Sequence, residues 1–169
     1  MSVIEDYYDQ TTDDEWKRLG ERHRTEFAVS FRAMKEYLPD PPAAVLDLGG
    51  GPGRYAIALA GRGHQVTLAD LSSANLASAR DRAKEAGVEL AAYDQVNALD
   101  LSRYTSESFD AALVMGPLYH LIQAGDRVQA LREVHRVLKP AGIALIAFIT
   151  RISPFRDSAQ GYPDWVVEN

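Results

Sequence analysis

The residues best suited to chemistry in this chain surround one glycine-rich turn. They are Asp47, Gly49, Gly50, Gly51, Gly53 and Asp70. Glycines let the backbone turn sharply and approach a ligand more closely than a Cβ atom allows. A helix beginning at Arg54 would point its free N–H groups and the positive end of its dipole at the turn. Asp70 closes the next predicted strand, where a carboxylate can accept hydrogen bonds from ribose hydroxyls, so the pattern predicts a nucleoside-binding site.

Two classes of nucleoside ligand fit this spacing. Residues 51–56 read Gly-Pro-Gly-Arg-Tyr-Ala and satisfy the looser G-x-G-x-x-A form of the dinucleotide fingerprint, which would indicate a nicotinamide-dependent oxidoreductase. Asp47 favours a different ligand, because a carboxylate two residues before the turn would repel a pyrophosphate and attract a cation. S-adenosylmethionine carries ammonium and sulfonium cations and is such a ligand.

The motif resembles the first motif of the class I S-adenosylmethionine-dependent methyltransferases, D-x-G-x-G-x-G, which stands here at residues 47–53. The resemblance continues in order along the chain and covers roughly residues 43–150. It implies that Asp70 binds the ribose, that Leu71 packs on the adenine, and that Asn97 and Ala98 read the adenine amino group. Residues 109–121 resemble the fourth strand of the family and the loop that carries the reacting atoms, with Met115 at the donor.

The same resemblance implies transfer of a methyl group to a small-molecule acceptor, leaving S-adenosylhomocysteine. His120, with Tyr119 beside it, is the candidate general base for an acceptor that must lose a proton. A purely structural histidine at the start of the next helix is the alternative. We also expect Tyr7, Tyr8 and Trp16 to close over the donor and contact its cationic end, and the alternative is that these aromatic residues only pack the helices on the sheet. His64 and His135 are interpreted as surface residues.

An alternation of strands and helices must position these residues. Strands are predicted at 43–48, 65–69, 89–93, 109–115 and 143–149, with helices at 22–38, 54–61 and 73–86 and further helices between the strands. Strands separated by helices pair in parallel with right-handed crossovers, which predicts a doubly wound, Rossmann-like α/β sheet. We divide the chain into an N-terminal helical lid and connector (1–42), a donor-binding core (43–150) and a tail (151–169) that begins a substrate-covering region.

Composition is consistent with this reading. The 169 residues contain 46% hydrophobic residues, no cysteine and no apolar stretch long enough to span a bilayer. The acidic first residues lack the features of a signal peptide, so we expect a cytoplasmic protein without membrane attachment. The net charge of −6 disfavours nucleic acid as a partner. No His and carboxylate residues stand at metal-ligand spacing, so no metal is predicted.

One departure from the family affects function. Class I methyltransferases usually end in an antiparallel hairpin after strand five, whereas only 19 residues follow Thr150 here, with no strand-turn-strand pattern. We therefore expect the hairpin to be absent and strand five to be an uncovered edge, protected by the tail or by a homodimer. A donor-binding module without catalysis is the second hypothesis, and an NAD-dependent oxidoreductase is the third.

Overall fold

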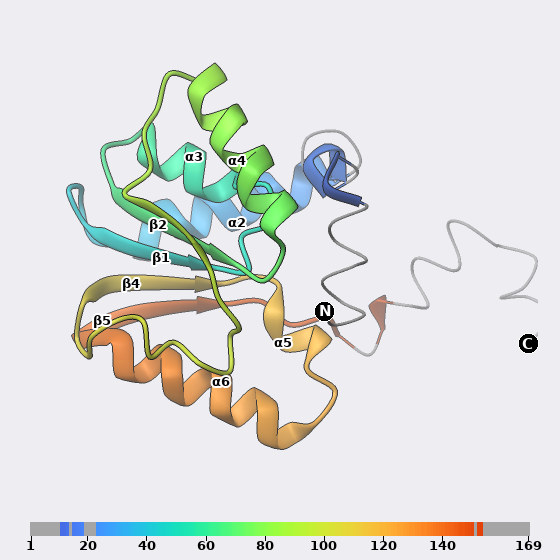
Figure 1. The fold of residues 1–169 in the computed structure, drawn as a ribbon, viewed down its shortest axis with the longest axis vertical. Coiled ribbons are helices and arrows are strands. Elements are labelled where there is room, and N and C mark those ends of the chain that lie inside the picture. Colours follow the sequence, from blue (N-terminus) through green and yellow to red (C-terminus); the bar gives the residue numbers. More distant parts are fainter. Residues whose placement is uncertain (1–10, 14, 19–22, 151, 154–169) are drawn as a thin grey trace, which may run out of the picture.

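The computed structural model describes residues 11–13, 15–18, 23–150 and 152–153. Tyr7 and Tyr8 lie outside the described residues. Helical backbone at 11–13 and 15–18 precedes a regular series of elements (Figure 1). These are α2 (Arg24–Tyr37), β1 (Ala44–Leu48), α3 (Arg54–Ala60), β2 (Gln65–Asp70), α4 (Ser73–Glu85), β3 (Ala92–Gln95), β4 (Phe109–Val114), α5 (Pro117–His120), α6 (Ala124–Val137) and β5 (Leu138–Ile146).

The five strands form one parallel sheet in the order β3-β2-β1-β4-β5. β1 is central, pairing with β2 on one side and with β4 on the other. The chain first winds outward from β1 through β2 to β3, and then returns to the other side of β1 through β4. This order creates a switch point between β1 and β4, where loops leave the sheet in opposite directions. The doubly wound α/β prediction is confirmed.

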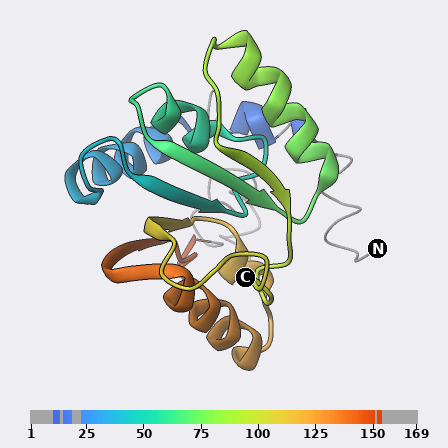
Figure 2. The same ribbon diagram turned by 60° about the vertical axis from the view of Figure 1, so that its left-hand side comes forward.

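Alternating side chains of the strands build two cores, one on each face of the sheet. Figures 1 and 2 show the helices that cover these two faces. Helices α2, α3 and α4 cover the first face, and their buried residues include Met34, Leu59 and Leu76. Helix α6 and the short α5 cover the second face. The strands are nearly all apolar because helices cover both faces, as parallel sheets require. The one exception in β1 is Asp47, which is fully buried.

The connection from β3 to β4 differs from the sequence prediction. β3 begins at Ala92 instead of residue 89, and no helix is assigned between β3 and β4. The side chains of Asn97 and Asp100 accept backbone N–H bonds from residues two positions ahead, Leu99 and Ser102. Such turns compete with helix formation. The connection instead packs against the second core through apolar side chains, notably Leu101, which is fully buried.

Strand β5 also differs from its predicted range of 143–149. It begins at Leu138, directly after α6, because Leu138 pairs with Phe109 of β4. The register then shifts between Phe109 and Ala111, and regular pairing resumes where Ile143 pairs with Ala111. β5 ends at Ile146 and lies at the edge of the described sheet. Beyond it, Phe148 and Ile149 are exposed.

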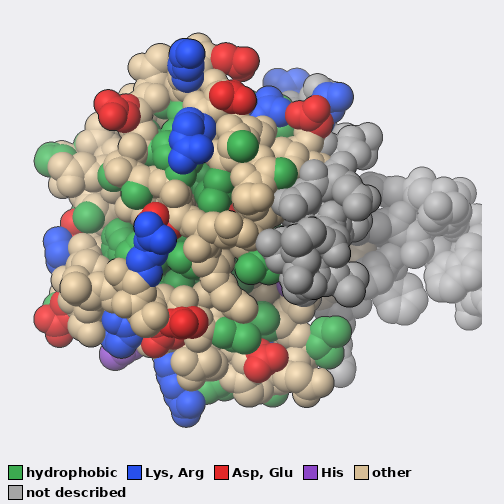
Figure 3. All heavy atoms as spheres, viewed as in Figure 1, with side chains coloured by type: hydrophobic (Ala, Val, Ile, Leu, Met, Phe, Trp, Pro, Cys, Tyr) green, Lys and Arg blue, Asp and Glu red, His purple; other side chains and the backbone are tan. Residues whose placement is uncertain are grey.

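The described surface carries charges of both signs. On the face shown in Figure 3, basic and acidic side chains are interspersed. His135 is exposed as predicted, whereas the surface assignment of His64 is wrong: only 8% of it is exposed, and burial lowers its pKa. Among the described helices, none has the length and apolar character to cross a membrane.

Candidate functional site

A cavity lies at the carboxyl ends of the strands, over the switch point between β1 and β4. Loops after β1, β2, β3 and β4 all contribute to its wall, and residues from the helical segment 15–18 complete it. Ligands of doubly wound sheets bind at this position, because here loops diverge and leave a crevice that backbone N–H groups surround.

Most of the residues chosen from the sequence meet in this cavity. Its lining includes Gly49, Gly50, Gly51, Asp70, Leu71, Asn97, Ala98, Met115, Tyr119 and His120. Two predicted residues, Asp47 and Gly53, are not part of the lining. Gly53 instead occupies the N-cap of α3 in the left-handed region, with φ 81°, and lies close against α4. Its role is therefore to shape the turn.

The glycine turn is tightly enclosed on the protein side. A Cβ atom on Gly49 would lie 2.6 Å from Cγ of Pro117, and the φ of Gly49 is +68°. A Cβ atom on Gly50 would lie 2.5 Å from a carboxylate oxygen of Asp47. Neither position has room for a side chain, so glycine is required for the turn to pass between the start of α5 and the buried acid.

Asp70 joins this turn to the end of β2. One of its carboxylate oxygens accepts the N–H of Gly51 at 2.8 Å, and the other accepts the N–H of Ser72 at 2.9 Å. The amide of Asn75 donates to the second oxygen at 3.3 Å. Burial raises the pKa of Asp70, while these three donors oppose the rise. The carboxylate is thus held at the cavity wall, where it remains the predicted ribose ligand.

Asp47 lies beneath the turn instead of within the cavity. Its side chain is completely buried, and neither carboxylate oxygen has a hydrogen-bond partner of ordinary geometry among the described residues. Burial is the main cause that raises its pKa to about 7, and the negative charge of Asp70 raises it further, while the N–H of Ala56 has a weaker opposing effect. The binding of the donor by Asp47 stays a prediction, since the structure places this carboxylate beneath the turn and not in the lining of the cavity. Its charge acts on the cavity from below.

Asn97 is placed differently from the simplest prediction. It lines the cavity, but its side-chain oxygen accepts the N–H of Leu99 at 3.0 Å and so shapes its own loop. A carbonyl oxygen can accept a second hydrogen bond. The predicted contact with an adenine amino group stays a prediction, and Ala98 contributes an apolar surface beside it.

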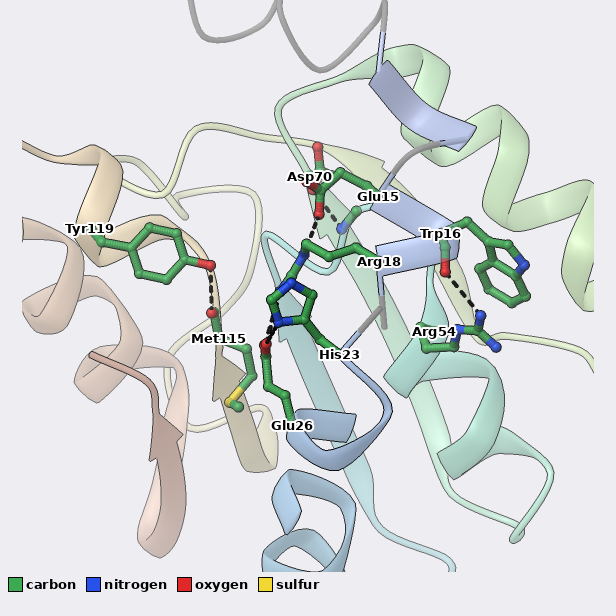
Figure 4. A network of polar contacts seen from close by, with 10 residues as sticks. Glu15, Trp16, Arg18, His23, Glu26, Arg54, Asp70, Met115 and Tyr119 are labelled. Carbon is green, nitrogen blue, oxygen red and sulfur yellow. Dashed lines mark hydrogen bonds and ion pairs between the residues drawn. The ribbon is translucent and has the colours of Figure 1, made fainter. Parts of the chain in front are cut away.

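Tyr119 and His120 stand together on α5, with ring centroids 4.8 Å apart. The hydroxyl of Tyr119 donates to the carbonyl of Met115 at 3.1 Å (Figure 4), and partial burial raises its pKa. Burial lowers the pKa of His120 below its ordinary 6.5, although the charges of Glu15 and Asp70 oppose this. At neutral pH His120 is thus uncharged and able to accept a proton, whereas Tyr119 keeps its own.

Sequence reasoning missed Glu15 and Arg18, which line the cavity from the N-terminal segment. The guanidinium of Arg18 donates to Glu15 at 3.0 Å and to both carboxylate oxygens of Glu26 at 3.0 and 3.1 Å (Figure 4). The spacing of three between Glu15 and Arg18 was a visible signal for a helical ion pair. Their position at the cavity was not, because it depends on how this segment docks.

Trp16 explains the docking of that segment. Its indole ring lies between two guanidinium groups, with Arg54 at 3.8 Å and Arg82 at 4.3 Å from the ring. Arg54 also donates to the carbonyl of Trp16 at 2.9 Å, and Arg82 donates to Asp13 at 2.7 Å. Trp16 does not line the cavity, so it anchors the segment to α3 and α4 and leaves Arg18 to face the site.

These features fit S-adenosylmethionine. The turn leaves no space for Cβ atoms on its protein side and exposes backbone at the cavity, as close approach to a ligand requires. Asn75 lines the cavity with a buried side-chain oxygen that has no hydrogen-bond partner among the described residues. The buried carboxylates Asp47 and Asp70 favour a cationic ligand. Within the part of the chain described, no cluster of three or more His, Asp or Glu residues is arranged to hold a metal.

Comparisons with known proteins agree with this site. The family model for methyltransferase domains matches residues 45–142. The ubiquinone biosynthesis O-methyltransferase of Pseudomonas syringae pv. tomato is 36% identical over 107 residues, which cover 63% of this chain and 44% of that protein. The 2-phytyl-1,4-naphtoquinone methyltransferase of a Nostoc species is 36% identical over 168 residues, which cover 95% of this chain and 68% of that protein.

Among solved structures, the [4+2]-cyclase SpnF is similar with a TM-score of 0.62 and 31% identity, over 69% of this chain and 43% of that one. The chain thus spans less than half the length of the first curated relative and of this structure.

We predict that replacing Asp47 with Asn changes how stability depends on pH. A carboxyl whose pKa rises from 3.8 to about 7 on folding destabilises the folded state by up to about 4 kcal/mol once it is ionised. The wild-type free energy of unfolding should therefore fall as the pH rises from about 4 to 7. At pH 8, Asp47→Asn should be about 1–2 kcal/mol more stable than wild type, since a buried unpaired amide retains part of the cost.

Urea unfolding at pH 5 and pH 8 measures this difference. Asp81→Asn, at an exposed position of α4, is the matched control and should follow the wild type at both values. Equal free energies of unfolding for wild type and Asp47→Asn at pH 8 would show that ionisation of the buried carboxyl does not destabilise the folded state.

We also predict that Trp16→Leu loosens the N-terminal segment. The substitution keeps an apolar side chain but removes both cation–π contacts, each of which contributes about 0.5–1 kcal/mol. Amide hydrogen exchange at residues 15–18 should become about tenfold faster, while exchange in β1 stays the same. Val29→Ala, at an exposed position of α2, is the control. Unchanged exchange at 15–18 would contradict the anchoring role.

Proposed function

The chain belongs to the class I S-adenosylmethionine-dependent methyltransferases, and on that premise we propose that it transfers a methyl group from S-adenosylmethionine to a small-molecule acceptor. The observation that carries the proposal is the single cavity wall in which the glycine turn, Asp70 and His120 meet. One part of this wall suits the nucleoside of a donor, and another offers a proton acceptor.

The donor would extend along the carboxyl ends of the strands. Asp70 would hold the ribose, Leu71 and Ala98 would contact the base, and the glycine turn would lie against the backbone of the donor. The side of the cavity formed by Arg18 would take the amino-acid end, since a guanidinium binds carboxylate through paired hydrogen bonds. In this proposal Tyr7 and Tyr8 also cover the cationic methionine end of the donor. The proposal further divides the chain into a lid (1–42), a donor-binding core (43–150) and a tail (151–169).

S-Adenosylmethionine supplies, when bound, a methyl group already activated on a sulfonium sulfur. The work of the protein is then to position the acceptor and exclude water. For a hydroxyl acceptor, His120 would accept the proton as the oxygen receives the methyl group, which its lowered pKa permits at neutral pH. Tyr119, held by the carbonyl of Met115, would shape the acceptor side of the cavity.

The acceptor class follows from two supports. The walls near α5 are mostly apolar, with Met115, Pro117 and Leu121 facing the cavity. Two relatives are named for acceptors of quinone type. We therefore propose a hydroxylated, largely apolar ring compound as the acceptor. As a separate part of the proposal, the reaction takes place in the cytoplasm.

The second candidate function is donor binding without methyl transfer. It is favoured by the similarity to a protein named as a [4+2]-cyclase, a reaction that is not methyl transfer. In either case the edge of β5 and the exposed Phe148 and Ile149 offer a surface for a second copy of the chain. A homodimer through this edge belongs to the proposal, and its stoichiometry can be measured by sedimentation.

Calorimetric titration tests the proposed function first. We expect micromolar binding of S-adenosylmethionine and S-adenosylhomocysteine and no binding of NAD. Turnover is then measured as S-adenosylhomocysteine formed with a panel of hydroxylated quinols. Binding without turnover would favour the second candidate, and binding of NAD alone would overturn the assignment of the donor.

We predict that His120→Gln lowers kcat by about 100-fold with a hydroxyl acceptor, while the affinity for S-adenosylhomocysteine changes little. In the wild type, the rate should rise with pH to a plateau, and the midpoint of the rise should lie below pH 6.5, because the pKa of His120 is lowered and its neutral form is the base. His135→Gln, on the exposed side of α6, is the control. Normal turnover by His120→Gln would exclude His120 from proton transfer.

A further inference from the structure

Two residues of α6 that do not line the cavity hold the loop that forms its base-binding wall. Glu133 accepts the backbone N–H of Leu101 at 2.8 Å. Arg136 donates to the carbonyl of Leu101 at 2.8 Å and to the carbonyl of Tyr104 at 2.9 Å. The two side chains are also joined to each other by hydrogen bonds of 2.8 and 3.2 Å. Together they form a two-residue clamp, Glu133 with Arg136.

The loop held by this clamp contains no helix of its own. Residues 96–108 connect β3 to β4 through turns, with Asn97 and Ala98 at one end facing the cavity. Leu101, three residues after Ala98, is completely buried, and both its N–H and its carbonyl are bound by the clamp. Between Ala98 and Leu101 the backbone closes on itself, since the N–H of Asp100 donates to the carbonyl of Asn97 at 3.0 Å. The position of Leu101 is therefore coupled to that of Asn97.

We propose that Glu133 and Arg136 are positioning residues for recognition of the donor base, acting through the loop that carries Asn97 and Ala98. This inference rests on the proposed function. A bidentate pair with charge-assisted hydrogen bonds fixes geometry more strictly than a neutral contact. Residues behind a ligand-contacting group commonly set its precision, and a small displacement of the loop would cost selectivity between similar bases.

The experiment compares two ligands that differ in the base alone. S-adenosylhomocysteine carries an amino group on its purine, and S-inosylhomocysteine carries an oxygen at the same place. The ratio of their Kd values measures recognition of the base. This ratio does not depend on the fraction of folded protein, because a loss of folded protein weakens both ligands equally. A merely structural role would leave it unchanged.

We expect the wild type to prefer S-adenosylhomocysteine by tenfold or more, a difference that one well-placed hydrogen bond can supply. In Glu133→Ala and in Arg136→Lys, the preference should fall to about threefold or less, with most of the change in the Kd of S-adenosylhomocysteine. The double variant should be little worse than either single one, because the pair acts as a unit. Arg132→Gln, an exposed arginine on the same helix, is the matched control and should keep the wild-type preference.

Should Glu133→Ala not fold, Glu133→Gln provides the same comparison with a smaller change. Amide exchange at Leu101 and Ser102 adds a second measurement, and it should accelerate in each clamp variant. A wild-type ratio near one, or an unchanged ratio in both clamp variants, overturns the positioning role while leaving donor binding intact. Failure of the wild type to bind S-adenosylhomocysteine overturns the proposed function itself.

Discussion

The site depends on one hydrogen bond, from the N–H of Gly51 to the carboxylate of Asp70. It joins the turn after β1 to the end of β2, the two neighbouring strands on one side of the switch point. The turn can reach Asp70 only because Gly49 and Gly50 pass through space in which a Cβ atom would collide with Pro117 or with Asp47. Sheet order, glycine content and buried charge are therefore parts of one arrangement.

The same arrangement is electrostatically costly in the free protein. Asp47 and Asp70 are both buried, each carries a raised pKa, and the charge of Asp70 contributes to the rise at Asp47. A folded protein retains such a pair only where the rest of the structure is stable enough to hold it. The large apolar cores on both faces of the sheet provide that stability. Binding of a cation above the pair would relieve the repulsion between the two carboxylates.

Sequence reasoning succeeded where the determinants are local. The glycine turn, Asp70 and the apolar strands β1, β2 and β4 follow from residue type and period, and the structure places them as predicted. It failed where the answer depends on contacts between distant segments. The burial of His64, the early start of β5 at Leu138 and the arrival of Arg18 at the cavity all arise from tertiary packing.

Asp47 illustrates the boundary between the two. Its residue type and its place in the motif were visible in the sequence, and the inference that its charge favours a cation follows from Coulomb's law at any short distance. The sequence did not show on which side of the turn the carboxylate of Asp47 lies. The face of the sheet that a strand residue occupies becomes known only once the strand is paired with both of its neighbours. Helices cover both faces of β1, so alternation gives no polar side to use as a guide.

The two ends of the cavity are built from different parts of the chain. This separation explains why membership of the family does not identify the methyl acceptor. Turns after β1, β2 and β3 form one part of the cavity wall, and their form is constrained by glycine sterics and by the bonds of Asp70. The opposite wall comes from α5 and the N-terminal segment, which pack through a few side chains such as Tyr119 and Trp16. Under the proposed function, changes in that wall would alter the acceptor without disturbing the turns after β1, β2 and β3. Related chains can thus share a donor site and carry out different reactions, and the acceptor must be sought in the residues around α5.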